Sequence, residues 1–182
     1  MKKFILAIAA VLLLSQAALA GGKTLVVYYS ASGTTEKAAK LLAKNLGADL
    51  FAVECAQPYS EADWDWTNKN SRASREYADP KLRKVELKTT KVEGWETYDT
   101  VYLGYPIWWG IAAWPLTSFV AANDFKGKTV IPFATAASSG IGNSGKLLEK
   151  EAGSGTWLEG TRFYSSKITE EEVQKWLSKL KK

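Results

Sequence analysis

Short apolar, β-branched runs alternate along the chain with stretches in which apolar positions recur at helical spacing. The apolar runs are predicted as five strands, at residues 24–29, 49–54, 100–104, 129–134 and 161–164. Helical patterns follow four of them and begin near residues 35, 115, 143 and 169. Strands that alternate with helices in this way predict a parallel sheet covered by helices on both faces.

Two local sequence features bear on these predictions, one against the fourth strand and one in favour of the last helix. Pro132 lies inside the fourth apolar run and has no N–H to donate to a sheet, which argues against a central strand. We keep the strand because the run is apolar and flanked by turns. The last helix has the clearest start, because Thr169 and Glu172 form a capping box before an apolar face made by residues 173, 176, 177 and 180.

Residues 57–98 form a polar and aromatic segment that is long for a connection within a compact domain. Within this excursion, residues 71–78 are predicted as a helix that ends before Pro80. Tyr59, Trp64 and Trp66 indicate that the excursion packs against the rest of the domain.

The first 20 residues have the features of a secretory signal peptide. Lys2 and Lys3 precede an apolar core at residues 4–14, and Ala18-Leu19-Ala20 is a small-residue cleavage site. A membrane anchor needs about 20 apolar residues, and this core is too short. We therefore predict export, to the bacterial periplasm, and no stable membrane insertion after cleavage. The domain is predicted to span residues 21–182.

Composition excludes several kinds of chemistry. The sequence has no histidine, which rules out Ser-His-Asp triads, Cys-His dyads and histidine–metal sites. Cys55 is the single cysteine, so no internal disulfide can form, and we predict it as a small buried apolar residue. The formal net charge is +5, or +3 once Lys2 and Lys3 are removed, and no run of basic residues indicates a nucleic-acid partner.

The first strand runs directly into a hydroxyl-rich turn before a helix begins. This turn, residues 30–35, has the sequence SASGTT. Free N–H groups and the dipole of a helix N-terminus favour an anion, the hydroxyls add donors, and Gly33 lets the backbone approach it closely. An ordinary capped turn uses the same residue types. Without the lysine of a nucleotide-triphosphate loop, the turn suits a monophosphate.

Two further loops follow the third and fourth strands, at residues 105–110 and 135–143. In a doubly wound sheet these loops and the first turn converge outside the carboxyl ends of the strands. Trp108 and Trp109 offer faces on which a flat heterocycle can stack, and the second loop offers small residues and backbone N–H groups. Packing of both tryptophans in the core is the alternative.

Taken together, the three loops resemble those of the flavodoxin family. The SASGTT turn is similar to the FMN phosphate loop of that family, and Tyr98-Asp99 followed by residues 104–108 (GYPIW) resembles the lead-in to its first flavin loop. Residues 125–130 (FKGKTV) are similar to the lead-in to its fourth strand. The resemblance covers residues 23–182. It implies a flavodoxin-like, doubly wound five-stranded parallel sheet of order 2-1-3-4-5 with helices on both faces.

The resemblance also implies non-covalent FMN and one- or two-electron transfer by that cofactor. The implied phosphate ligands are Ser30, Ser32, Gly33, Thr34 and Thr35. The implied contacts of the isoalloxazine are Pro106, Ile107, Trp108, Trp109 and Gly110 on one side and Ser138, Ser139 and Gly140 on the other. The backbone carbonyl of Gly110 is the implied acceptor for N5–H of the reduced flavin.

Two departures from the family affect the predicted role. Flavodoxins are usually strongly acidic and dock basic partners, whereas this chain is slightly basic, so a redox partner is predicted to be acidic. The predicted signal peptide is the second departure, because most members of the family are cytoplasmic. Three functions stay open: an FMN electron carrier, which we favour, an FMN-dependent reductase of a quinone or similar acceptor, and a non-redox binding protein for another phosphorylated ligand.

Overall fold

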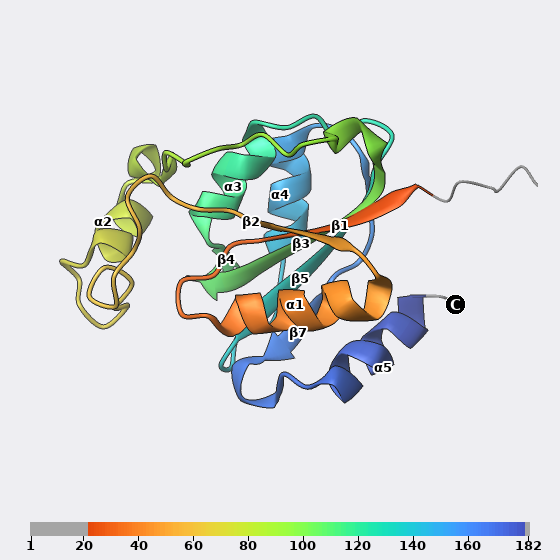
Figure 1. The fold of residues 1–182 in the computed structure, drawn as a ribbon. Helices are drawn as coiled ribbons and strands as arrows, with labels where there is room; N and C mark the ends of the chain where they lie inside the picture. Colours follow the sequence, from red (N-terminus) through yellow and green to blue (C-terminus); the bar gives the residue numbers. More distant parts are fainter. Residues whose placement is uncertain (1–21, 181–182) are drawn as a thin grey trace, which may run out of the picture.

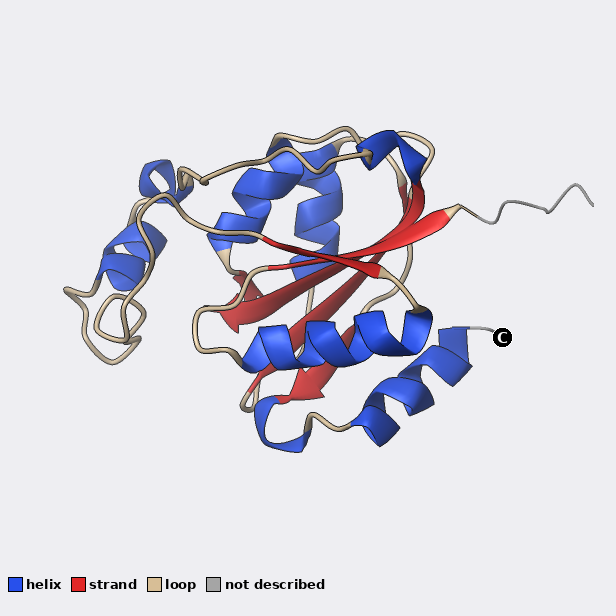
Figure 2. Cartoon of the chain, viewed as in Figure 1, coloured by secondary structure: helices blue, strands red, loops and turns tan. Residues whose placement is uncertain are grey.

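The computed structural model describes residues 22–180 as one sheet with helices on both faces (Figures 1 and 2). The predicted signal peptide, residues 1–20, lies outside the described residues. The main sheet contains β1 (Lys23–Tyr28), β2 (Asp49–Ala52), β3 (Tyr98–Trp108), β5 (Thr129–Ala136), β6 (Thr156–Trp157) and β7 (Thr161–Tyr164). The short strand β4 (Ile111–Ala112) pairs antiparallel with β3.

The strand order confirms the predicted topology. The order is β2-β1-β3-β5, with β6 and β7 both pairing parallel with the far side of β5. In sequence order this is 2-1-3-4-5, with the fifth position divided between two short strands. The prediction of five strands missed this division and the short strand β4.

Pro132 explains why the fifth position is divided. The carbonyls of Lys128 and Val130 accept hydrogen bonds from Thr156 and Leu158 on the β6 side. Because backbone groups alternate in direction along a strand, Pro132 faces the same side, where it has no N–H to give. β6 ends at Trp157 and β7 begins at Thr161, on either side of that position. Pro132 is therefore tolerated in β5 because no strand pairs with that side of β5 at this position, and two short strands, β6 and β7, take the place of one continuous strand.

The sheet is covered by two pairs of helices. Helices α1 (Thr34–Leu46) and α5 (Glu170–Leu180) cover one face, and α3 (Trp114–Ala121) and α4 (Ser144–Ala152) cover the other (Figure 1). Leu42 and Trp176 pack with Val26 on the first face, and Phe119 and Leu148 pack with strand residues on the second. One of the two bonds of the predicted capping box is present, since the Glu172 N–H donates to Thr169 Oγ1. Two buried layers thus hold the sheet.

The excursion forms its own short helix, α2 (Arg72–Ala78), which Ser71 caps, followed by 3-10 turns at Pro80–Arg83 and Trp95–Thr97. Figure 1 shows α2 projecting beyond the end of the sheet where β4 lies. Tyr59 is buried and Trp64 is half-buried, as predicted. The prediction for Trp66 was wrong, because its side chain is 73% exposed. Cys55 is buried, as predicted.

Candidate functional site

The loops that follow β1, β3 and β5 leave the sheet at the same edge. Tyr28 pairs with Gly104 across β1 and β3, and Pro106 pairs with Thr135 across β3 and β5. Since these strands are parallel, their carboxyl ends lie side by side, and the three predicted loops converge there. The structure therefore brings together the sequence segments that the predicted site requires.

The turn at residues 30–33 leads into helix α1. Gly33 adopts a left-handed conformation with φ +81° and occupies the N-cap position, where it has no side chain to bond the first-turn N–H groups. Ser32 Oγ and Thr34 Oγ1 lie 3.0 Å apart at the surface. Thr35 is buried, and its hydroxyl lies 2.7 Å from that of Thr135 at the end of β5. This contact joins the first loop to the third.

A buried hydroxyl in this turn has no protein partner. Ser30 Oγ is buried without a hydrogen bond, which normally costs free energy unless a ligand or water supplies the partner. A Cβ placed on Gly33 would meet no atom within 4 Å, so the space in front of the helix N-terminus is open. The unpartnered Ser30 hydroxyl, the free N–H groups of the α1 N-terminus and the open space at Gly33 are suited to binding a phosphate monoester.

The second loop differs from the prediction in its backbone. Residues 105–108 were predicted as a loop, but they continue β3, and only Trp109 and Gly110 form the turn into β4. Both turn residues have positive φ, +46° and +82°, as a two-residue type I′ hairpin requires. Positive φ is unfavourable for tryptophan, so the hairpin holds Trp109 against its local preference.

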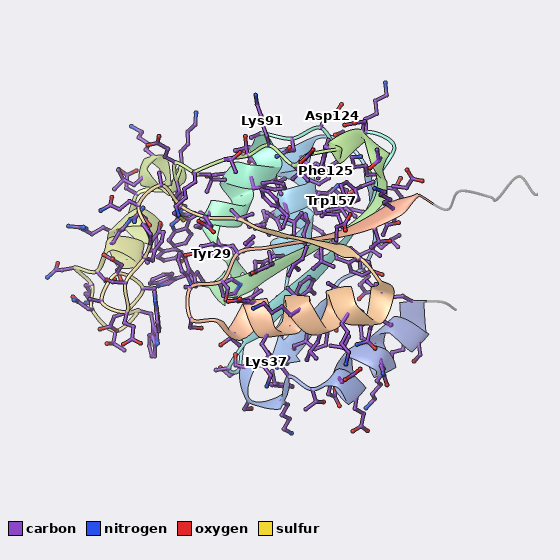
Figure 3. All side chains as sticks on the ribbon, in the orientation of Figure 1. Tyr29, Lys37, Lys91, Asp124, Phe125 and Trp157 are labelled. Carbon is purple, nitrogen blue, oxygen red and sulfur yellow. The ribbon has the colours of Figure 1, made fainter. Side chains whose placement is uncertain are left out.

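Both tandem tryptophans belong to an aromatic cluster at this edge. The ring of Trp108 makes edge contacts with Tyr29, Tyr59 and Trp114 at centroid distances of 5.8, 5.2 and 4.8 Å. Trp109 stacks against Tyr77 at 5.0 Å and against Trp114 at 5.9 Å, with interplanar angles of 13° and 27°. Figure 3 shows Tyr29 on the side of the molecule that faces the excursion. The cluster thus joins the first loop, the second loop and the excursion.

A buried carboxylate, which sequence reasoning missed, anchors this cluster. Glu76 Oε2 accepts the Tyr59 hydroxyl at 2.6 Å and the Trp114 indole N–H at 2.7 Å, and Oε1 accepts Arg72 Nε at 2.8 Å. The Arg72 guanidinium also lies over the Tyr59 ring, 3.8 Å from its centroid. In the sequence, Glu76 is one glutamate in a polar segment, and nothing near it predicts a buried carboxylate. Its role as an anchor depends on Trp114, which is distant in the sequence.

Burial controls the titration of groups near the cluster. It raises the pKa of Tyr29 and of Tyr59 well above the ordinary value, and the hydrogen bond to Glu76 adds to the effect at Tyr59. Burial also raises the pKa of the Cys55 thiol to about 11. These groups are therefore neutral at physiological pH, and the thiol has little nucleophilic character.

The third loop exposes Ser138, Ser139 and Gly140 at the surface. Its far end is held by Ser144, whose hydroxyl donates to the Ile141 carbonyl at 2.6 Å and lies 3.0 Å from the buried Tyr105 hydroxyl. The loop lies at the edge where the resemblance places one side of the flavin. Contact of its residues, and of residues 106–110, with a flavin stays a prediction.

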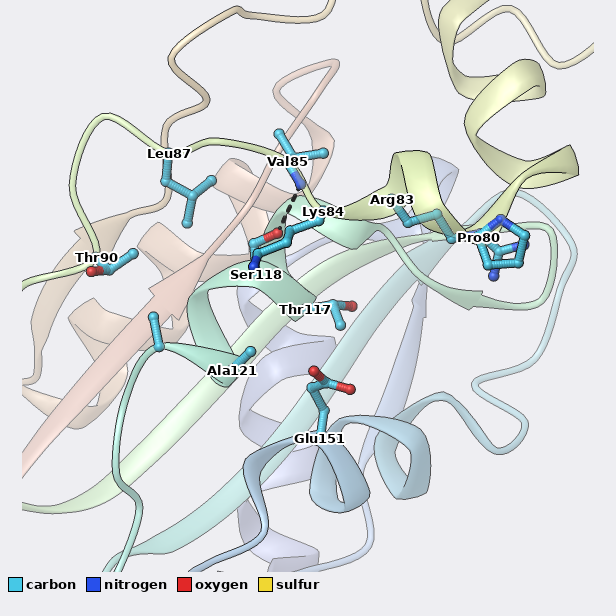
Figure 4. A pocket seen from close by; sticks show the side chains of 11 residues that line it. Pro80, Arg83, Lys84, Val85, Leu87, Thr90, Thr117, Ser118, Ala121 and Glu151 are labelled. Atoms are coloured by element: carbon cyan, nitrogen blue, oxygen red, sulfur yellow. Dashed lines mark hydrogen bonds between the residues drawn. The ribbon is translucent and has the colours of Figure 1, made fainter.

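Two surface pockets are present, of which one lies away from the three loops and the other includes the end of the third loop, residues 141–143. One, of about 630 Å³, lies between the excursion and α3 and is lined by Arg83, Lys84 and Ser118 among others (Figure 4). The other, of about 490 Å³, lies beside α4 and the segment between β6 and β7. Residues 22–180 contain no cluster of metal-binding side chains and no helix long and apolar enough to cross a membrane.

Comparison with known proteins places the chain among flavoproteins. Residues 23–180 match the protein family described as Flavodoxin. Among solved structures, a protein from Bacteroides eggerthii DSM 20697 assigned as a flavoprotein is 44% identical, with a TM-score of 0.77, over 86% of this chain and 96% of that one. A similarly assigned protein from Bacteroides uniformis ATCC 8492 is 42% identical, with a TM-score of 0.79, over 87% and 99%.

A more distant structure contains a cofactor. The flavoprotein of Lactobacillus acidophilus NCFM, solved in complex with FMN, is 21% identical, with a TM-score of 0.62, over 86% of this chain and 99% of that one. At this identity the likeness concerns the fold. No match was found among curated proteins.

Proposed function

The chain belongs to the flavodoxin family, and on that premise we propose that it holds FMN at the three loops and carries electrons between partner proteins. FMN supplies the redox chemistry, accepting one or two electrons at its isoalloxazine ring. The protein supplies the site and tunes the cofactor. The observation that carries the proposal is that all three segments meet at one sheet edge, where Thr35 contacts Thr135 and where Tyr29, directly before the first turn, contacts Trp108 at the end of β3.

The phosphate would lie at the N-terminus of α1. The unpartnered Ser30 hydroxyl and the open space before Gly33 favour this position. Ser32 and Thr34 present further hydroxyls at the surface of the same turn. The helix dipole and the free first-turn N–H groups favour the phosphate's negative charge.

The isoalloxazine would lie between the β3–β4 hairpin and the third loop. Trp109 would border the isoalloxazine in an aromatic wall, and it is ordered beforehand because Tyr77 and Trp114 stack on it and the hairpin fixes its backbone. Side chains that are already ordered lose little entropy when a ligand binds. Gly110 follows Trp109 in the turn, and its carbonyl would accept N5–H of the reduced flavin.

An electron carrier fits the excursion better than a reductase does. Tyr59, Tyr77 and Glu76 pack the excursion directly on the tryptophans of the hairpin. The 630 Å³ pocket is instead lined by the outer side of α3, away from the loops. An acceptor such as a quinone needs space beside the flavin, and the packed excursion fills the space on its own side.

We also propose that the protein works after export to the bacterial periplasm, because residues 1–20 have the pattern of a signal peptide. Fractionation of cells that express the full chain tests this directly. Mature protein that begins near residue 21 in the periplasmic fraction supports export. A cytoplasmic protein that keeps residues 1–20 contradicts it.

The first experiment is titration of the mature protein with FMN, followed by visible absorption and flavin fluorescence. Quenched emission and shifted bands at micromolar FMN support the cofactor site. Stepwise reduction then separates the roles: two resolved one-electron steps favour the carrier, and rapid NADH- or NADPH-driven reduction of a quinone favours the reductase. No quenching, together with binding of another phosphorylated compound, favours the non-redox binding protein.

A further inference from the structure

Basic residues are concentrated in one short part of the excursion. Residues 22–180 contain 20 basic and 19 acidic side chains, a net charge of +1. Residues 69–84 alone contain six basic and two acidic side chains, a net charge of +4. The rest of the described chain therefore carries a net charge of −3. The whole excursion, residues 57–98, contains eight basic and eight acidic side chains, so the positive charge is local to residues 69–84.

Part of this positive charge is offset by acidic side chains, because Asp63 lies within electrostatic range of Arg72 and Arg75, but the charges at residues 81 and 84 are exposed. Within the described part of the chain, Arg72 pairs with Glu76, but Lys81 and Lys84 form no ion pair and are exposed. Arg83 donates to the backbone carbonyls of Glu76 and Tyr77. These carbonyls neutralise no full charge, so the segment presents its charge to solvent.

Apolar side chains lie among these cations. Tyr77 is 40% exposed and Leu82 is 52% exposed. The Tyr77 ring stacks on Trp109 with an interplanar angle of 13°. Because Trp109 is a residue of the β3–β4 turn, this surface directly contacts that turn. Arg83 and Lys84 also line the 630 Å³ pocket beside α3, with Glu151 of α4 on its other side, so the surface has a hollow next to its charges (Figure 4).

We propose that this surface docks an acidic redox protein. The basic surface consists of Lys69, Arg75, Lys81, Arg83 and Lys84 together with Tyr77 and Leu82. Its positive field would attract and orient an acidic partner, while the apolar side chains lose their hydration at the contact. Docking here would place the partner's redox centre against the aromatic wall. The electron-transfer part of this inference rests on the proposed function, but the docking itself does not.

The test compares two double variants with equal changes in net charge. Lys81→Glu/Lys84→Glu reverses two charges of the basic surface. Lys175→Glu/Lys179→Glu reverses two exposed charges on α5, which Figure 1 shows far from α2. The probe is an acidic plant-type [2Fe–2S] ferredoxin, and its affinity for each protein is measured by calorimetry at low and high ionic strength.

We expect the surface variant to bind the probe at least about tenfold more weakly at low ionic strength, and the α5 variant to stay within about twofold of the parent protein. Added salt should weaken binding of the parent protein and change the surface variant little. Equal loss in both variants would show a general charge effect and overturn the assignment. So would an unchanged affinity in the surface variant.

Electron transfer is measured separately, with FMN-loaded protein and reduced ferredoxin in a stopped-flow instrument. One electron leaves the iron–sulfur cluster and one enters the flavin, and the rate should fall only in the surface variant. Failure to load FMN contradicts the proposed function but leaves the calorimetric result standing. Loaded protein whose electron-transfer rate is the same in both variants contradicts docking at the basic surface as the route for electrons.

Discussion

The hydroxyls of Thr35 and Thr135 lie 2.7 Å apart, although the two residues are 100 positions apart in the sequence. Thr35 is in the first turn of α1 and Thr135 is near the end of β5, and both are buried. One hydroxyl donates to the other, so only one of their two protons is used between them. The second proton is available for a hydrogen bond to another acceptor. Thr135 can therefore hold the Thr35 hydroxyl in place while Thr35 donates to a phosphate.

Thr35→Ala should weaken FMN binding by about 1–3 kcal/mol and riboflavin binding much less, because riboflavin has no phosphate to accept the lost hydrogen bond. Fluorescence titration with both ligands measures the difference. Thr135→Val is the matched control, since it removes the partner hydroxyl but leaves the turn intact. It should destabilise the protein with less discrimination between the ligands. Equal losses of FMN and riboflavin in Thr35→Ala would contradict the phosphate assignment.

Gly110→Ala should lower the free energy of unfolding of the cofactor-free protein by about 1–2 kcal/mol. Gly110 has φ +82°, where a Cβ is unfavourable, although the added atom would meet nothing within 4 Å. The cost is therefore one of backbone conformation. Gly140→Ala is the control, because Gly140 has no positive φ and its nearest neighbour would be 3.9 Å away. Urea unfolding of both variants checks the difference, and equal effects would argue against the type I′ turn.

Glu76→Gln should cost about 3–5 kcal/mol of unfolding free energy, despite its similar shape. The carboxylate accepts three donors, from Tyr59, Trp114 and Arg72, and an amide presents its own N–H groups to some of them while leaving Arg72 without a counter-charge. Glu86→Gln, at an exposed position of the same excursion, should change stability by less than about 0.5 kcal/mol. A loss below about 1 kcal/mol in Glu76→Gln would show that the carboxylate is not the anchor.

Stability should fall as the pH rises from about 10 to 12. Burial raises the pKa of Tyr105 to about 12, and burial with a hydrogen bond to Asp49 raises that of Tyr98 to about 12. Their ordinary value is 10, so the unfolded chain releases these protons first and deprotonation favours unfolding. Each tyrosine lowers the free energy of unfolding by up to roughly 1.4 kcal/mol per pH unit within that window. Below about pH 10 the two tyrosines do not affect the pH dependence of stability.

Urea unfolding at a series of alkaline pH values measures this slope. Tyr105→Phe removes one titrating group, so its stability should fall less steeply than that of the parent protein over the same window. Curves of identical slope would show that Tyr105 is not held neutral by the fold.

The sequence by itself determined the elements and their order. Alternating apolar runs, the glycine-containing turn before α1 and the Thr169 side-chain cap of α5 act over a few residues, so their effects can be predicted locally. Parallel strands joined by helices then bring their carboxyl ends to one edge, which is why the convergence of the three loops was predictable. The hydroxyl-rich turn was also recognisable as an anion site before any contact was known.

Only the tertiary structure decided which side chains support that edge. Glu76 is a polar residue in a polar segment until Trp114, 38 positions later, donates to it within the buried cluster. Pro132 divides the fifth position of the sheet because of the side to which its backbone faces, a fact set by pairing with β6. Trp109 takes a conformation that tryptophan disfavours because it lies in the two-residue turn between β3 and β4, where Tyr77 and Trp114 stack on its ring. Such contacts join distant parts of the chain, so no local pattern predicts them.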